Sequence, residues 1–89
     1  MTINIDQLKK KIIYRSKYRG SKEMDSLLGD FTKKFIDQLN YDDLINLSSF
    51  LDIDDENLYK FKSGLSTSMK IENNKISNLF KNFKYNNIG

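Results

Sequence analysis

The residues best suited to chemistry lie in one short stretch, Arg19-Gly20-Ser21-Lys22-Glu23. Arg19 offers a planar fork of N–H donors, which suits a carboxylate or a group of carbonyl oxygens. Gly20 lets another backbone approach where a Cβ would collide. Glu23 supplies a carboxylate that could orient the guanidinium or accept hydrogen bonds from a partner. These groups favour recognition of another molecule over bond making.

A structural interpretation accounts for part of the same stretch. Gly20 is an acceptable helix N-cap, and the Glu23 side chain could accept a hydrogen bond from the N-cap backbone while its charge meets the positive end of the helix dipole. This capping does not explain Arg19. It also does not explain the nearby cations Arg15 and Lys17, which would crowd positive charge against a helix N-terminus.

The composition leaves little material for an enzyme. The chain has 89 residues, enough for one domain that buries about 60% of its unfolded surface. It contains no Cys, His or Trp, which excludes disulfides, Cys/His metal sites and catalysis by imidazole or thiolate. No glycine-rich nucleotide loop is present either. We therefore expect no catalytic, cofactor-binding or metal-binding residues.

Targeting signals are also missing from the sequence. No apolar run approaches the ~20 residues that cross a bilayer, and no signal-peptide apolar region follows the basic start at residues 9–11. The sequence predicts a soluble, unprocessed chain without stable membrane insertion.

The net charge of +3 hides a division along the chain. Residues 1–22 carry seven Lys and Arg against Asp6, residues 23–59 carry two Lys against ten acids, and residues 60–89 carry six Lys against Glu72. Such asymmetry favours contact with a charged partner. It fits equally well an attraction within the molecule between an acidic middle and basic ends.

Apolar residues at helical spacing predict two long helices early in the chain. The first covers residues 5–17. The second covers residues 21–38 and has the clearest amphipathic pattern, at Met24, Leu27, Leu28, Phe31, Phe35, Ile36 and Leu39. At 1.5 Å per residue it would be about 27 Å long, enough to cross a domain of this size.

Capping residues predict two shorter helices after these. Asn40 with Asp43 three positions later opens the third helix, and Asp52 or Asp54 opens the fourth, which Gly64 ends. The acidic run at residues 52–56 lacks the Gly and Glu of an EF-hand loop and is therefore interpreted as capping.

A fifth helix is predicted to open at Ser66, Thr67 or Ser68. Its apolar stripe consists of Ile76, Leu79, Phe80 and Phe83. Because no segment has the pattern of a strand, the expected fold is all-α, a single compact five-helix bundle over residues 1–89 with a frayed tail at residues 85–89.

Residues beyond the Arg-Gly turn extend its pattern and point to a family. Arg19, Gly20 and Glu23 are followed in register by Asp25, Leu27, Leu28 and Phe31. In this arrangement residues 8–64 resemble the FAD assembly factors of succinate dehydrogenase (SdhE in bacteria, assembly factor 2 in mitochondria), which have Arg-Gly-x-x-Glu between two helices, then Asp, a Leu pair and Phe. The resemblance implies the same five-helix architecture.

The resemblance also implies a function. The chain would be a non-catalytic assembly factor that binds the flavoprotein subunit of succinate dehydrogenase, and in bacteria also of fumarate reductase. It would promote covalent attachment of FAD to a His of that subunit without carrying flavin itself. It would be a monomer when free, in the bacterial cytoplasm. The expected partner-binding residues are Arg15, Lys17, Tyr18, Arg19, Gly20, Glu23 and Asp25. Tyr14 is expected in the core.

Four positions depart from the family pattern. Tyr18 replaces a second basic residue, Ser21 a common Met, Glu56 a frequent bacterial Pro, and Phe61 a frequent Trp. These changes bear on fine contacts more than on function. The alternative is a small basic helical module that binds nucleic acid or serves as an adaptor, although the ten acids in the middle of the chain would repel phosphate.

Overall fold

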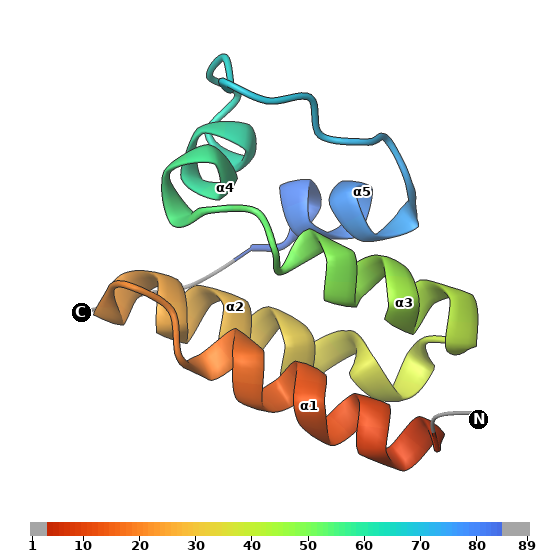
Figure 1. The fold of residues 1–89 in the computed structure, drawn as a ribbon. Coiled ribbons are helices and arrows are strands. Elements are labelled where there is room, and N and C mark those ends of the chain that lie inside the picture. The colour runs from red at the N-terminus through yellow and green to blue at the C-terminus, as the bar shows by residue number, and fades with distance from the viewer. Residues whose placement is uncertain (1–3, 85–89) are drawn as a thin grey trace.

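The computed structural model describes residues 4–84, which form helices joined by irregular segments, with no strand in this range. The elements are α1 (Ile5–Lys17), α2 (Lys22–Phe35), the 3-10 turn η1 (Ile36–Gln38), α3 (Tyr41–Phe50), α4 (Asp55–Lys62) and α5 (Lys75–Asn82). The predicted all-α class and five-helix bundle are confirmed (Figure 1). The predicted frayed tail, residues 85–89, lies outside the described residues.

The α1–α2 hairpin forms one side of the molecule. In Figure 1 these two helices run antiparallel at the bottom, and α3, α4 and α5 lie above them. α1 packs on α2 and α3, while α5 packs on α3 and α4. Within residues 4–84 no helix is both long and apolar enough to span a membrane.

The core is centred on the apolar stripe of α2, as the periodicity predicts. Phe31 is 1% exposed. Its ring lies edge-on to Phe80 of α5, with the ring centroids 5.3 Å apart, and to Phe83 at 5.5 Å. Ile76 is also buried, and Leu79 packs against the core from outside. These contacts join the middle of α2 to the last helix and confirm the predicted stripe of α5.

Local capping sets most helix ends. Asn40 caps α3 in a capping box with Asp43, as predicted. Asp54 caps α4, and its carboxylate accepts hydrogen bonds from the Asn57 side chain at 2.8 Å and the Asn57 backbone at 3.2 Å. These bonds, the side-chain one foremost, lower the pKa of Asp54. Gly64 follows α4 with φ of 78°, a conformation that glycine adopts without strain.

The predicted start of α5 at residues 66–68 is wrong. α5 begins after Asn74, whose side chain accepts from the Ser77 backbone N–H at 3.0 Å. Ser68 instead donates its backbone N–H to Asn57 at 2.9 Å, and its hydroxyl accepts from the Asn57 amide at 3.0 Å. Because a distant residue occupies this hydroxyl, it does not cap a helix, and residues 65–74 run irregularly between α4 and α5.

Candidate functional site

The turn between α1 and α2 carries the Arg-Gly motif. Ser21 is the N-cap of α2, with an extended backbone and a hydroxyl that accepts from the Met24 N–H at 3.2 Å. The predicted capping by Gly20 with Glu23 is therefore wrong. The helix starts one residue later because serine has the side-chain oxygen that glycine lacks. Glu23 instead lies exposed in the first turn of α2.

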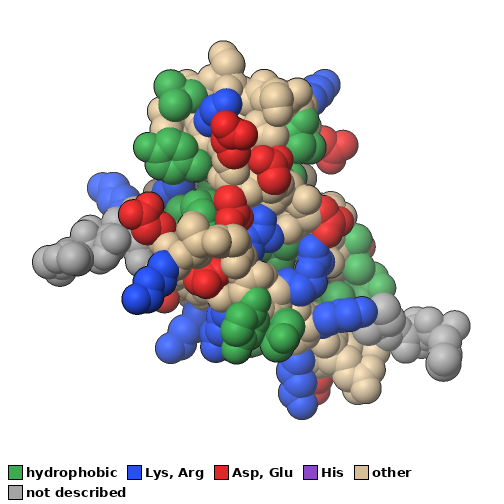
Figure 2. All heavy atoms as spheres, turned by 60° about the vertical axis from the view of Figure 1, so that its left-hand side comes forward, with side chains coloured by type: hydrophobic (Ala, Val, Ile, Leu, Met, Phe, Trp, Pro, Cys, Tyr) green, Lys and Arg blue, Asp and Glu red, His purple; other side chains and the backbone are tan. Residues whose placement is uncertain are grey.

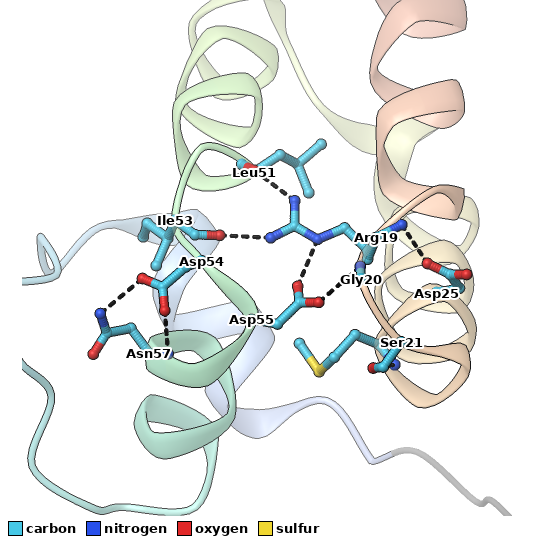
Figure 3. Close-up of polar contacts among 10 residues, drawn as sticks. Arg19, Gly20, Ser21, Asp25, Leu51, Ile53, Asp54, Asp55 and Asn57 are labelled. Carbon is cyan, nitrogen blue, oxygen red and sulfur yellow. Dashed lines mark hydrogen bonds and ion pairs between the residues drawn. The ribbon is translucent and has the colours of Figure 1, made fainter.

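The Arg19 side chain points into the molecule rather than outward (Figure 3). Its Nε donates to Asp55 Oδ1 at 2.8 Å, and its two terminal nitrogens donate to the carbonyls of Leu51 at 2.6 Å and Ile53 at 2.5 Å. The side chain is only 11% exposed. One guanidinium thereby joins the turn after α1 to the corner between α3 and α4.

Two carboxylates hold the backbone of the same turn. The second oxygen of Asp55, Oδ2, accepts from the Gly20 N–H at 3.0 Å. Asp25, from the first turn of α2, accepts from the Arg19 N–H. Asp55 therefore binds the side chain of Arg19 and the backbone of Gly20 at once (Figure 3).

These contacts correct the expected placement of the motif arginine. The sequence predicts an exposed fork facing a partner and oriented by Glu23, with Asp25 among the partner-binding residues. The structure directs Nε and both terminal nitrogens of Arg19 to groups of the chain itself, and Asp55 is the carboxylate that orients the guanidinium. Asp25 instead contacts the Arg19 backbone.

Arg15 makes a related tie one helical turn earlier. Its Nη1 donates to the Ser48 carbonyl at 3.1 Å and to the Ser48 hydroxyl at 3.0 Å, while its Nη2 pairs with Asp52. The Arg15 side chain is 33% exposed and that of Asp52 is 72% exposed. Arg15 is thus also engaged within the chain, although in a wetter setting than Arg19.

Other residues of the predicted set remain open to solvent. Lys17, Gly20 and Glu23 are exposed, and Tyr18 is 68% exposed. Lys and Arg side chains dominate the lower half of the face in Figure 2, where α1 and α2 lie, and acidic side chains gather above them. The exposed members of the predicted set therefore sit around the fixed turn.

Tyr14 belongs to this open surface, and its predicted place in the core is wrong. It is 65% exposed because the buried face of α1 runs through Leu8 and Ile12, and a residue two positions after Ile12 is turned about 200° away. The Tyr14 and Tyr18 rings lie with their centroids 4.6 Å apart. They line a hollow of about 280 Å³ together with Lys10, Ile13 and Lys17.

Asp55 is the important residue that the sequence did not identify. Its acidic run was interpreted as helix capping, which holds for Asp54 but not for its neighbours. A usable signal was nevertheless present. The chain has just two arginines, Arg15 and Arg19, four residues apart, and Asp52 and Asp55 lie three residues apart. The two arginines pair with these two acids in the same order along the chain, Arg15 with Asp52 and Arg19 with Asp55.

Comparison with known proteins adds a family to this geometry. Residues 10–84 match the family model described as the flavinator of succinate dehydrogenase. A curated relative, the mitochondrial succinate dehydrogenase assembly factor 2 of Penicillium rubens, is 39% identical over 49 residues, which cover 55% of this chain and 16% of the relative. The match thus spans about a sixth of that relative's length. No solved structure matches the chain.

Proposed function

This chain belongs to the flavinator family of succinate dehydrogenase, and from that membership we propose that it binds the flavoprotein subunit of the enzyme and promotes covalent attachment of FAD to it. The family expected from the sequence is confirmed by the match over residues 10–84. The family's role is assembly, which agrees with a non-catalytic protein. The flavoprotein of fumarate reductase is proposed as a second client, and the free chain as a monomer.

The fixed turn between α1 and α2 is the observation that carries this proposal. Arg19 and Asp55 hold the turn, so Gly20 and Glu23 are presented to solvent on a preformed support. A surface that is already ordered loses less conformational entropy when it binds than a flexible loop would lose. The exposed side chains of Lys17 and Tyr18 supply adjacent contacts of types common at interfaces.

The proposed action is positioning. The family resemblance implies that the reacting groups are the flavin and a His of the flavoprotein, and this chain has no imidazole or thiolate of its own to offer. Binding of the factor would hold the part of the flavoprotein that carries this His against the flavin and exclude water from the site. Restricting orientation in this way can lower a barrier by several kcal/mol without any added reacting group.

A Gly20→Arg variant tests the proposal. The φ angle of Gly20 lies outside the left-handed region, so the substitution does not force a strained backbone. The new Cβ would come within 3.2 Å of Asp55 Oδ2, so that side chain must shift slightly, and the circular dichroism spectrum should stay helical. The added side chain should collide with the flavoprotein. Covalent flavin, measured as in-gel fluorescence of the denatured subunit, should fall to the level seen without the factor.

Asn78→Arg, which adds the same side chain at an exposed position of α5, is the control and should keep normal flavinylation. Normal fluorescence with a folded Gly20→Arg protein would place the turn outside the interface. Failure of the wild-type chain to bind either flavoprotein in titration would refute the proposed function itself.

A further inference from the structure

Asp55 joins the two motif residues although it lies far from them in the sequence. Building on the function proposed above, we infer that Asp55 is a positioning residue for flavoprotein binding, which acts by holding the Arg19-Gly20 turn in its binding conformation through one carboxylate oxygen on each residue. Asp55 is the first residue of α4 and so links that helix to the turn between α1 and α2 (Figure 3).

The geometry makes Asp55 the central group of the turn. Its Oδ1 accepts from Arg19 Nε at 2.8 Å and its Oδ2 accepts from the Gly20 N–H at 3.0 Å. The side chains of Asp55 and Arg19 are 26% and 11% exposed, so water competes weakly for the bond between them, whereas the bond from the Gly20 N–H lies at the surface. The carboxylate also lies close beside Gly20, because a Cβ built there would come within 3.2 Å of Oδ2.

The other acceptors of the Arg19 guanidinium are main-chain carbonyls, those of Leu51 and Ile53. These carbonyls belong to the backbone of the α3–α4 corner and are present whatever side chains the corner carries. Among residues 4–84, Asp55 is therefore the only side chain that accepts from the Arg19 guanidinium, and its identity decides whether the guanidinium is held in register with Gly20. The arginine of the motif serves the partner indirectly, by fixing the exposed residues beside it.

Replacing Asp55 by Asn separates this role from simple packing. Asparagine has the same shape, but one of its terminal atoms is an acceptor and the other is a donor. It can accept from Arg19 or from Gly20 but not from both, so one N–H of the turn would face an NH₂ group. The substitution should loosen the turn without opening a cavity.

Asp52→Asn is a matched control. The substitution is the same, it lies three residues earlier in the same acidic run, and it removes the corresponding ion pair with Arg15. Asp52 does not contact the Arg19-Gly20 turn through any hydrogen bond among residues 4–84. The control therefore separates the loss of any Arg–Asp ion pair from the loss of the Arg19–Asp55 pair.

The experiment compares wild type, Asp55→Asn and Asp52→Asn, each shown to be folded by circular dichroism. Two quantities are measured, the rate of covalent flavin attachment as a function of factor concentration and the hydrogen exchange rate of the Gly20 amide. Asp55→Asn should lower the attachment rate at limiting factor by about tenfold or more, with recovery at high factor concentration because affinity is what is lost. Gly20 exchange should accelerate by about tenfold. Asp52→Asn should change both quantities by less than about twofold.

The first turn of α4 benefits from an acidic residue, so Asp55→Asn removes some helix stability as well as the tie to the turn. A second variant separates these two effects. Asp55→Glu keeps that charge but moves the carboxylate by one methylene, so it should preserve helix content and still reduce attachment. Unchanged attachment in both Asp55 variants, or an equal loss in Asp52→Asn, would overturn the inference. If the wild-type chain promotes no attachment, the proposed function fails separately, and an unchanged Gly20 exchange rate in Asp55→Asn would by itself overturn the role of Asp55.

Discussion

At the residue scale, each of the two arginines of this lysine-rich chain binds several acceptors at once, which a lysine could not do. Arg19 reaches three acceptors with three nitrogens, and Arg15 reaches the Ser48 carbonyl and hydroxyl and the Asp52 carboxylate. A lysine ammonium is a single compact group and cannot span acceptors arranged around a plane. The motif arginine is therefore part of the scaffold that presents the motif.

Because the Arg19 guanidinium is bound within the chain, its truncation should lower the stability of the fold. Arg19→Ala would leave Asp55 Oδ1 and two carbonyls without their donor in a poorly hydrated corner, so we expect a loss of about 3 kcal/mol in the free energy of unfolding. Arg15→Ala breaks a more exposed pair and should lose less than about 1 kcal/mol. Urea titration followed by circular dichroism measures both values. No loss for Arg19→Ala would mean that the guanidinium is mostly in solvent, and a loss for Arg15→Ala as large as that for Arg19→Ala would contradict the ranking of the two sites.

Sequence reasoning identified the motif but not the direction of its arginine, for a physical reason. A guanidinium that binds a partner and one that binds its own chain need the same donors, so residue type alone does not separate them. The deciding acceptor, Asp55, is 36 residues away, and nothing local to Arg19 indicates it. Lys17, Tyr18, Gly20 and Glu23 are expected at a partner surface from their residue types and the family resemblance, and the structure leaves all four exposed.

At the scale of elements, helix ends were predictable where their caps are local. Asn40 and Asp54 cap helices through residues three positions away, and the predicted α1 agrees with the structure at both ends. The start of α5 was not predictable, because Ser68 has the right chemistry for a cap but is taken by the buried side chain of Asn57. A competing tertiary partner of this kind leaves no local pattern.

The N-cap of α4 provides a test that depends on pH. Hydrogen bonds from Asn57 lower the pKa of Asp54 below its ordinary 3.8, so its contribution to stability is present above that pH and is lost as pH falls through the lower folded-state pKa. Asp54→Asn retains a capping oxygen but does not titrate. The difference in free energy of unfolding between wild type and Asp54→Asn should therefore shrink as pH falls below 3.8. A difference that stays constant down to acid pH would mean that the Asp54 carboxylate is not bound by Asn57 in solution.

At the scale of the whole molecule, the uneven charge of the sequence is partly used within the fold. All five ion pairs found among residues 4–84 join a cation of the basic ends to an acid of the middle segment. Of the two interpretations left open by the sequence, attraction within the chain is confirmed for these charges. The same pairs tie α1 to the corner after α3 and bring the start of α5 to α3, so charge pattern and topology agree.

This internal pairing predicts how binding should respond to salt. A protein that neutralises many phosphates loses about a thousandfold or more in affinity between about 50 and about 200 mM salt, because counterions are released from the nucleic acid. Here five of the 15 Lys and Arg already have acidic partners within the chain, and the ten acids of residues 23–59 would repel a phosphate backbone. Affinity for the flavoprotein subunit should fall by less than about tenfold over that range, and affinity for a short DNA duplex should stay weaker than about micromolar throughout.

Titration calorimetry of the same preparation against both partners at each salt concentration gives the comparison. Tighter binding to the duplex than to the flavoprotein, with the steep salt slope of phosphate contacts, would favour the nucleic-acid-binding module that the basic composition first suggested.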